Sequence, residues 1–418
     1  MSKYGPPPPR SDIDFESLPW NLNHPEAHSY IHLITKSNWD ETHYNPATDS
    51  GCISNCIVPY SSTPLDIYPS TTSLNYGTSV WEGLKCFRLP SGRTAIFRPL
   101  KNLERFQRGC ERMCLPPPSL ELFCKVLQAV VQANGDLIPP CGHGMKLYLR
   151  PILFGSGQQL GLYPSPQFSY ITYVSPTGNY FKGKAATGLK VHLETQYSRA
   201  ARGGMGSTKC CGNYASTLFP LTRAKGCGYH DNLYMELDTY QRGNIEGAAI
   251  QEMSAANIFL VLRTGEIVTP SLSRGTILPG VTRDSVLVLA REYAEELQPL
   301  MVQSTGNAEV SVFVSERDVT VGDLTNASEV FVTGTAAEIV PVMSIGTNAD
   351  VLGEQEFHVD FPYGEQLPGG PVTEALLRML REVMAEERKV ATETGDGWLP
   401  DPYASAEEFR RQVLGGKN

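Results

Sequence analysis

Residues 203–214 read GGMGSTKCCGNY, and the rest of the chain is organised around this stretch. Lys209 stands between a glycine-rich approach and a Gly-Asn-Tyr exit. Glycines permit positive φ angles and close backbone approach, so the loop is suited to presenting a side chain. Three interpretations are open: a surface turn with a solvated lysine, a phosphate cradle, or a lysine that forms a Schiff base with an aldehyde cofactor. The cradle fails on spacing, because a P-loop has Gly before its Lys and Ser or Thr after it, whereas Thr208 precedes this lysine and Cys210 follows.

The length and the amino-acid composition are those of an ordinary globular protein. The 418 residues are enough for two or three domains, with 41% hydrophobic and 19% charged residues. A formal net charge of −9 and the lack of any dense Lys/Arg run argue against a nucleic-acid partner. No apolar run approaches the length of a membrane span, so no membrane partner is expected.

The N-terminal residues indicate the compartment. Pro6 to Pro9 are followed by acidic residues, without the apolar run of a secretory signal or the Arg-rich, acid-poor character of a mitochondrial presequence. A cytoplasmic location is therefore predicted. The ten cysteines lack the spacing of a disulfide module, and Cys52 and Cys56 have no His/Cys partner set at zinc spacing, so no metal site is predicted.

The first half of the chain predicts an irregular arm and then a small domain. Residues 1–30 are proline-rich and read as an N-terminal arm. A strand over 93–98 enters a helix at Pro99, and Ser119 is a predicted N-cap for a helix over 120–133. Residues 145–154 and 168–174 alternate like strands.

A cluster of breakers at 175–184 places a domain boundary there. We predict a small α+β domain over 31–176, an interdomain loop over 177–187 and a large α+β domain over 188–418. In the large domain, helices are expected from Asn213 to about residue 224, from a Thr282 cap to about residue 293, and over 373–386. Its predicted strands are 188–193, 232–237, 257–262, 266–269, 329–333 and 339–342.

A protein that uses pyridoxal phosphate needs five groups. They are a lysine to bind the aldehyde, an acid to pair with the ring nitrogen, a donor to the phenolic oxygen, a cradle for the phosphate and a site for the substrate carboxylate. Lys209 is the candidate for the aldehyde, and Tyr214 can reach the phenolic oxygen. Glu252 precedes an apolar strand, where a buried carboxylate needs a cationic partner such as a pyridinium N–H. Taken singly, Glu252 can be interpreted as a surface acid at a strand edge. Tyr214, taken singly, is more simply interpreted as an aromatic residue packed at the start of a helix.

Anion contacts have candidates in three further places. Arg98 ends a strand and can anchor a phosphate. The amides of Val281 and Thr282 open a helix, whose N-terminus attracts anions. In the turn after residue 333, Thr335 offers a hydroxyl to the phosphate and Ala336 an amide to the substrate carboxylate. An ordinary cap and an ordinary turn are the simpler interpretations of these segments taken alone.

In its order of motifs, the chain resembles the branched-chain amino acid aminotransferases, which are fold type IV pyridoxal-phosphate enzymes. The resemblance runs from Leu74 to Val342. It is carried by segments that read NYGTSVWEGLK, FRP, LYLRP, SPTGNYF, KCCGNYA, EMSAANIF, GTILPGVTR and TGTA. It implies a two-domain α+β fold similar to that of D-amino acid aminotransferase, with pyridoxal 5′-phosphate at the domain interface.

The resemblance also implies roles. Lys209 would be the Schiff-base lysine and general base, and Glu252 would pair with the ring nitrogen. Arg150 would suit the second carboxylate of glutamate, and some pocket residues would reach across a homodimer interface. The residues implied to line the substrate pocket are Tyr76, Trp81, Tyr148, Arg150 and Tyr180.

The implied reaction is transamination of L-leucine, L-isoleucine and L-valine with 2-oxoglutarate. Trp81 stands where the family usually has phenylalanine, and Ala255 replaces a hydroxyl that some members carry near the substrate carboxylate. Ala337 and Val340 replace the CxxC thiols of the mammalian enzymes. The alternatives are a paralogue that acts on another hydrophobic amino acid in a specialised pathway, a lyase or D-amino acid transaminase of the same fold, and a scaffold without activity.

Overall fold

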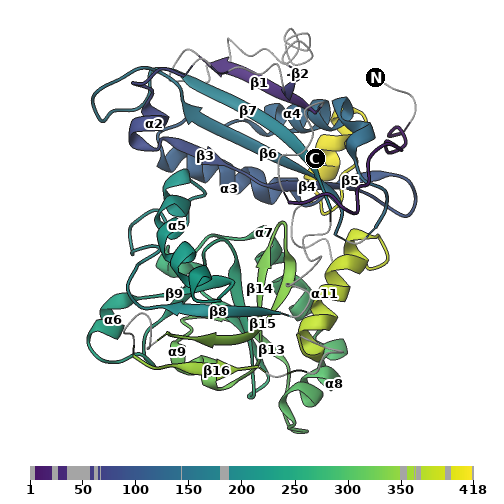
Figure 1. Ribbon diagram of the computed structural model, residues 1–418. Helices are drawn as coiled ribbons and strands as arrows, with labels where there is room; N and C mark the ends of the chain where they lie inside the picture. The colour runs from purple at the N-terminus through teal and green to yellow at the C-terminus, as the bar shows by residue number, and fades with distance from the viewer. Residues whose placement is uncertain are drawn as a thin grey trace.

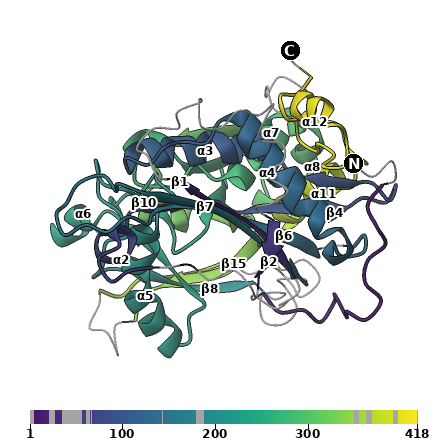
Figure 2. The ribbon, with the colours of Figure 1, turned by 90° about the horizontal axis from the view of Figure 1, so that it is seen from above.

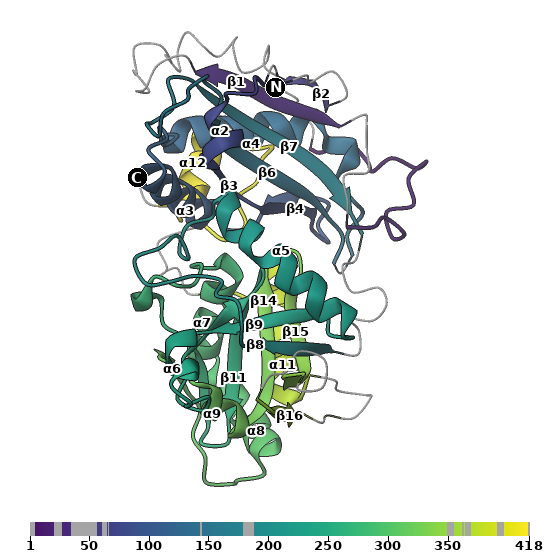
Figure 3. The ribbon, with the colours of Figure 1, turned by 60° about the vertical axis from the view of Figure 1, so that its left-hand side comes forward.

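The computed structural model describes residues 5–20, 27–34, 57–60, 65, 67–142, 144–178, 188–348, 355–361, 363, 369–390 and 397–416. Two β-sheets organise this part of the chain, one built before residue 178 and one after residue 188. Figure 1 shows them as an upper and a lower unit. Helix α5 (Cys211–Gly226) lies where the two units meet, as Figure 3 shows from the side.

The first sheet has seven strands in the order β2-β1-β7-β6-β4-β5, with β3 paired to β6. Within the described residues, the strand pairs of this sheet are all antiparallel. Its helices are α2 (Thr72–Tyr76), α3 (Pro99–Arg112), α4 (Leu120–Ala133) and a 3₁₀ turn at Gly135–Leu137. Its strands are β1 (His28–Ile34), β2 (Ile57–Pro59), β3 (Ser79–Trp81), β4 (Leu84–Arg88), β5 (Thr94–Ile96), β6 (Lys146–Gly155) and β7 (Phe168–Thr177).

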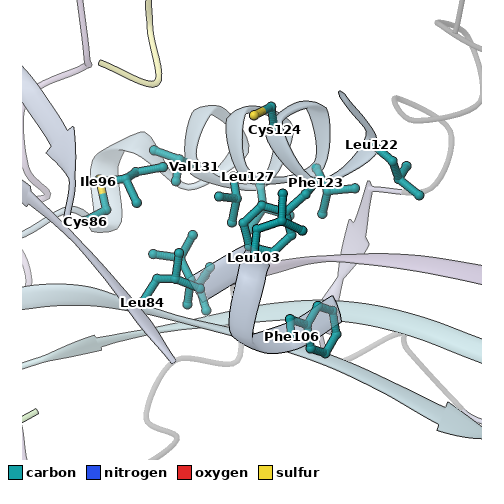
Figure 4. Packing of buried hydrophobic residues seen from close by; sticks show 14 of the residues in the cluster. Leu84, Cys86, Ile96, Leu103, Phe106, Leu122, Phe123, Cys124, Leu127 and Val131 are labelled. Atoms are coloured by element: carbon teal, nitrogen blue, oxygen red, sulfur yellow. The ribbon is translucent and has the colours of Figure 1, made fainter. Parts of the chain in front are cut away.

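Helices α3 and α4 bury their apolar stripes against this sheet. Leu103 and Phe106 from α3 meet Phe123 and Leu127 from α4 in one buried cluster (Figure 4). The Ser119 side chain accepts a hydrogen bond from the Leu122 amide, which fixes the start of α4 as predicted. Fully burying one such large apolar side chain contributes about 1.5–3 kcal/mol, so the stripe holds the two helices on the sheet.

The second sheet has nine strands in the order β10-β9-β8-β15-β14-β11-β12-β13, with β16 paired to β15. Strand β8 runs parallel to both β9 and β15, and β12 runs parallel to β13. The strands are β8 (Leu189–Glu194), β9 (Asp231–Met235), β10 (Ile250–Met253), β11 (Asn257–Leu262), β12 (Glu266–Pro270), β13 (Phe313–Arg317), β14 (Ala327–Gly334), β15 (Glu338–Gly346) and β16 (His358–Asp360).

Helices α7, α8 and α11 pack together beside this sheet, with Leu289, Met301 and Leu380 in one buried cluster. Besides α5, the described helices after residue 188 are α6 (Leu237–Gln241), α7 (Val281–Glu292), α8 (Ala294–Thr305), α9 (Val321–Thr325), α11 (Pro371–Met384), α12 (Ala406–Val413) and a 3₁₀ turn at Leu272–Arg274. None of the described helices is long and apolar enough to cross a membrane.

Most predicted elements are present within a few residues of their expected bounds, and three details differ. Thr282 is not the cap of its helix, because Gly280 holds the N-cap position and Thr282 lies in the first turn. That helix ends at Glu292, and α8, which follows at once, was not predicted. Glu252 precedes the predicted strand at 257–262, but it lies inside a further short strand, β10, that was not predicted.

The two ends of the described chain both pack on the first unit. Residues 5–20 form no helix or strand, yet Phe15 is buried, and the Arg88 guanidinium donates to the Pro7 carbonyl at 2.7 Å. Helix α12 lies against α4 (Figure 2) and adds Phe409 to the core of the first sheet. The domain bounds predicted from the sequence stay a prediction. Helix α12 falls within the predicted large domain, 188–418, but it packs on the first sheet. Most of the expected interdomain loop, residues 179–187, lies outside the described residues.

Candidate active site

The loop that carries Lys209 is held between the two sheets. It precedes α5, and the Lys209 carbonyl accepts a hydrogen bond from the Trp81 amide of β3 at 3.1 Å. Val80 forms an isolated antiparallel bridge with Cys210. A Cβ on Gly206 would lie 2.6 Å from the Thr276 carbonyl oxygen, so this position needs glycine. The loop is therefore fixed by both units before any ligand binds.

The Lys209 amine lies in an aromatic pocket. Its Nζ donates to the Tyr214 hydroxyl at 2.8 Å and lies 3.9 Å from the centroid of the Trp81 ring. The residue keeps some exposed surface, but its amine end is enclosed. Burial, with the Arg105 charge adding to it, lowers the Lys209 pKa to about 7. Near neutral pH a large share of these amines is uncharged, which is the form that acts as nucleophile or base.

Glu252 is a buried carboxylate with three polar contacts. Its Oε1 lies 2.7 Å from the Arg199 guanidinium and accepts the Leu278 amide at 2.9 Å. Its Oε2 accepts from Asn257 Nδ2 at 2.7 Å. Burial raises the Glu252 pKa, and the Arg199 charge opposes that rise. A carboxylate held in this way can accept an N–H from a cationic ring.

Six of the predicted cofactor contacts line one cavity, together with Arg105 and Arg199. The cavity has a volume of about 40 Å³. Helix α7 begins at Val281, and its free N–H groups and dipole favour an anion at this end. The predicted residues brought together here are Lys209, Tyr214, Glu252, Val281, Thr282 and Thr335.

Arg98 is not among the residues that line this cavity. It is fully buried at the N-cap of α3, with Nη1 donating to Ser285 Oγ at 2.8 Å and Nη2 pairing with Asp284 at 2.7 Å. Its guanidinium also stacks over the Trp398 ring at 4.2 Å. The side chain of Arg98 is thus bound to the first turns of α7, and its phosphate role stays a prediction.

Arg105 lines the cavity instead, two helical turns further along α3. Its Nε and Nη2 hold the two oxygens of buried Glu82 at 2.7 Å each, and its Nη1 donates to the Pro279 carbonyl at 3.1 Å. Neither Arg105 nor Arg199 was predicted from the sequence as a site residue. The one available signal for Arg105 was the seven-residue spacing, which puts it on the same face of the helix as Arg98.

Comparison with known proteins decides the family. Residues 82–345 match the family described as Amino-transferase class IV. Branched-chain-amino-acid aminotransferase 5, chloroplastic, of Arabidopsis thaliana is 41% identical over 281 residues, which are 67% of this chain and 61% of that enzyme. The chain thus spans less than two thirds of that relative. Branched-chain-amino-acid aminotransferase 2, chloroplastic, of the same plant is 34% identical over 392 residues, 94% of this chain and 86% of that enzyme.

The chain belongs to the class IV aminotransferases.

Solved structures of this class share the fold. The branched-chain amino acid aminotransferase of "Eschelichia coli" superimposes with a TM-score of 0.64 at 22% identity, covering 89% of this chain and 99% of that one. The enzyme from Thermoproteus uzoniensis, solved with norvaline, gives 0.64 at 23% identity, covering 90% and 100%. The predicted α+β architecture of fold type IV and the predicted resemblance to the branched-chain aminotransferase family are both confirmed.

Class IV aminotransferases depend on pyridoxal phosphate, and the branched-chain amino acid aminotransferase from Thermobaculum terrenum was solved in its PLP form. The donor set of this cavity fits that cofactor: an amine of low pKa, a phenol beside it, a buried carboxylate, and two arginines near a helix N-terminus. The fit depends on this donor set rather than on the volume of the cavity. Lys209, Tyr214, Glu252, Arg105 and the start of α7 are therefore the groups that would hold it.

The predicted substrate residues divide into two groups in this aminotransferase. Arg150 Nη2 donates to the Tyr148 hydroxyl at 2.9 Å, and its guanidinium lies 4.0 Å from the centroid of the Trp81 ring. These three residues form one wall beside Lys209. Tyr76 lies apart at the end of α2, where its hydroxyl donates to the Leu160 carbonyl. Tyr180 lies outside the described residues, and Ala336 lies in the turn between β14 and β15.

Proposed function

We propose that the protein is a branched-chain-amino-acid aminotransferase that exchanges the amino group of L-leucine, L-isoleucine or L-valine with 2-oxoglutarate. The observation that carries this proposal is the buried Lys209 amine, held between Trp81 and Tyr214 on the cavity that Glu252 also lines. The names of the Arabidopsis relatives support the substrate class.

When bound, pyridoxal phosphate supplies an aldehyde for the substrate amine and a ring that withdraws electrons. Lys209 Nζ would hold the aldehyde, and as a free amine it would carry the proton of the substrate α-carbon as general base. Its pKa of about 7 leaves it able both to take and to give that proton near neutral pH. Glu252 would pair with the ring nitrogen and keep it protonated, and Tyr214 would donate to the phenolic oxygen. Arg105 and the amides at the start of α7 would supply positive charge and N–H donors to the phosphate.

One pocket serves two kinds of side chain. The Trp81 ring and the Tyr148 ring present apolar surface to a branched side chain, and Arg150 stacks on both rings, at 4.0 Å and 5.1 Å. Its guanidinium keeps donors available for the second carboxylate of glutamate or 2-oxoglutarate. The aromatic wall also limits water beside the Lys209 amine.

A second candidate is a paralogue specialised for another hydrophobic amino acid. It is favoured by the Methionine aminotransferase BCAT4 of Arabidopsis thaliana, which is 34% identical over 342 residues, 82% of this chain and 84% of that enzyme. Trp81, where the family usually has phenylalanine, is the residue of this pocket wall that would reshape it. The ratio of kcat/KM for L-leucine and L-methionine separates the two candidates.

A homodimer is also part of this proposal. Leu160, Leu162 and Tyr163 are exposed at 89%, 79% and 71%, and Tyr76 contacts this loop. Monomeric proteins seldom leave so many large apolar side chains exposed together, so a second copy is the expected cover. Sedimentation of the wild type and of Leu160→Asp tests it, since a charge in this patch would shift a dimer toward monomer. The cytoplasmic location stays a prediction, because relatives are named both chloroplastic and mitochondrial.

The activity is tested with purified enzyme. L-leucine and 2-oxoglutarate are expected to give glutamate, while D-alanine gives none. Lys209→Ala is expected to lose both this activity and the visible absorption of the bound cofactor. Retention of glutamate formation by Lys209→Ala would refute the proposal, and a preference for D-alanine would move the enzyme to a different activity of the same fold.

A further inference from the structure

A second cavity, of about 330 Å³, lies between strands β4 and β6 of the first sheet and helix α11. It shares no lining residue with the cavity of Lys209. Its charged lining residues come from β4, β6, β15 and α11 and from the segment after α11. They are Lys85, Arg88, Lys146, Glu338, Arg381 and Glu387.

Three cations of this cavity converge on one carboxylate. Arg381 Nε donates to Glu338 Oε2 at 3.0 Å, whereas the Nζ atoms of Lys85 and Lys146 stand 3.8 Å and 3.9 Å from Glu338 Oε1. Only the arginine is within hydrogen-bond distance. Three positive charges against one negative charge leave an excess of two, and the excess is unchanged when Arg88 and Glu387 are added.

Within this cluster, the side chain of Lys85 is the one that most clearly indicates a ligand site. The residue is 2% exposed, and its Nζ has no hydrogen-bond partner among the described residues. Its neighbours are the Glu338 carboxylate at 3.8 Å and the Phe97 ring, whose centroid is 4.8 Å away. A buried ammonium group without an acceptor is costly. The pKa values respond accordingly: burial lowers that of Lys85 to about 8. Although burial alone would raise the pKa of Glu338, the surrounding cations hold it at about 2.

We propose that this cavity is a second ligand site, which binds a small carboxylate with a short apolar chain near Lys85 and Lys146. A carboxylate there would give Lys85 Nζ the acceptor that it lacks and would balance part of the excess charge. The remaining wall includes Phe87, Met145 and Met384. This apolar surface favours an organic carboxylate over inorganic phosphate.

The site shares a structural element with the active site. Lys146 Nζ donates to the Ala336 carbonyl at 2.8 Å, and Thr335, one residue earlier, lines the cavity of Lys209. Glu338, two residues after Ala336, has a φ of 57°, a left-handed conformation that a glutamate adopts only at a cost. The same short turn therefore presents one group to the active site and one to the second site.

Equilibrium dialysis with radiolabelled butyrate tests the proposal. The active site is first blocked by N-(5′-phosphopyridoxyl)-L-glutamate, the adduct with which one branched-chain amino acid aminotransferase of this fold was solved. Cofactor and substrate positions are then both occupied, so the outcome does not depend on which amino acid the enzyme uses. The blocked enzyme is expected to bind one butyrate per chain in a saturable way. Lys85→Met is expected to weaken this binding by about tenfold or more, because it removes a buried charged donor.

Glu338→Gln provides a second variant whose effect has the opposite sign. It removes the carboxylate that competes for the cations, so butyrate is expected to bind more tightly. Lys190→Met removes an exposed lysine of β8 and is expected to change nothing. The proposal is overturned if the blocked enzyme shows no saturable binding or if Glu338→Gln weakens it. It is equally overturned if a folded Lys85→Met binds like the wild type. Tighter binding of inorganic phosphate than of butyrate would overturn the assignment to a carboxylate.

Discussion

The protonation of Lys209 makes a prediction about stability that can be worked out from the structure. The pKa of Lys209 falls from the 10.5 of a solvated lysine to about 7 in the folded chain without cofactor. Between these two values the unfolded chain holds a proton that the folded chain has lost. Stability therefore rises with pH across this window, and Lys209→Met removes that dependence.

The magnitude follows from the two pKa values. Between about pH 7 and about pH 9.5, linkage gives the wild type a relative gain of at most about 3 kcal/mol over Lys209→Met. The surface that Lys209 keeps exposed reduces this gain to about 2 kcal/mol. Lys85 and the other titrating groups are common to both proteins, so their effects cancel in the comparison.

Urea unfolding of cofactor-free protein at the two pH values measures the difference. Lys190→Met, which removes an exposed lysine, is the control for the loss of one amine. A difference between wild type and Lys209→Met that is the same at both pH values would mean that Lys209 titrates as a solvated lysine. The argument for a neutral, nucleophilic amine would then be refuted.

Three further predictions concern the same site. Arg105→Lys is expected to weaken cofactor binding by about tenfold to a hundredfold, because it loses a charge-assisted contact to phosphate. Arg98→Lys is expected to lower the melting temperature and to leave cofactor affinity within about threefold. If a fluorescence titration shows that Arg98→Lys weakens cofactor binding more than Arg105→Lys does, Arg98 is the phosphate anchor that the sequence predicted. Glu252→Ala leaves Arg199 buried without its partner, so a loss of about 3 kcal/mol in unfolding free energy is expected together with a large fall in kcat. Trp81→Phe enlarges the pocket wall and is expected to raise kcat/KM for L-phenylalanine relative to L-leucine by about tenfold, which a steady-state comparison of the two substrates checks.

Local patterns in the sequence were enough to predict many of the elements and to single out Lys209, which the structure places on a cavity. The helices over 99–112 and 120–133 follow from apolar residues at helical spacing, and Ser119 is a cap by the chemistry of its hydroxyl. Lys209 stood out because glycines on its N-terminal side free the backbone to present it. These features depend on neighbours within a few residues, which a single sequence displays directly.

Tertiary structure alone decided which partners those residues meet. Arg98 and Arg105 are the same residue type on one helix, yet the first pairs with Asp284 of α7 and the second pairs with Glu82 and lines the cavity. Which of them reaches the cavity depends on how α3 packs on elements almost two hundred residues away. The Arg199–Glu252 pair and the Lys85 cavity arise in the same way. Burial and charge pairing are long-range properties, because they depend on every segment that excludes water from a group, and no local pattern in the sequence encodes them.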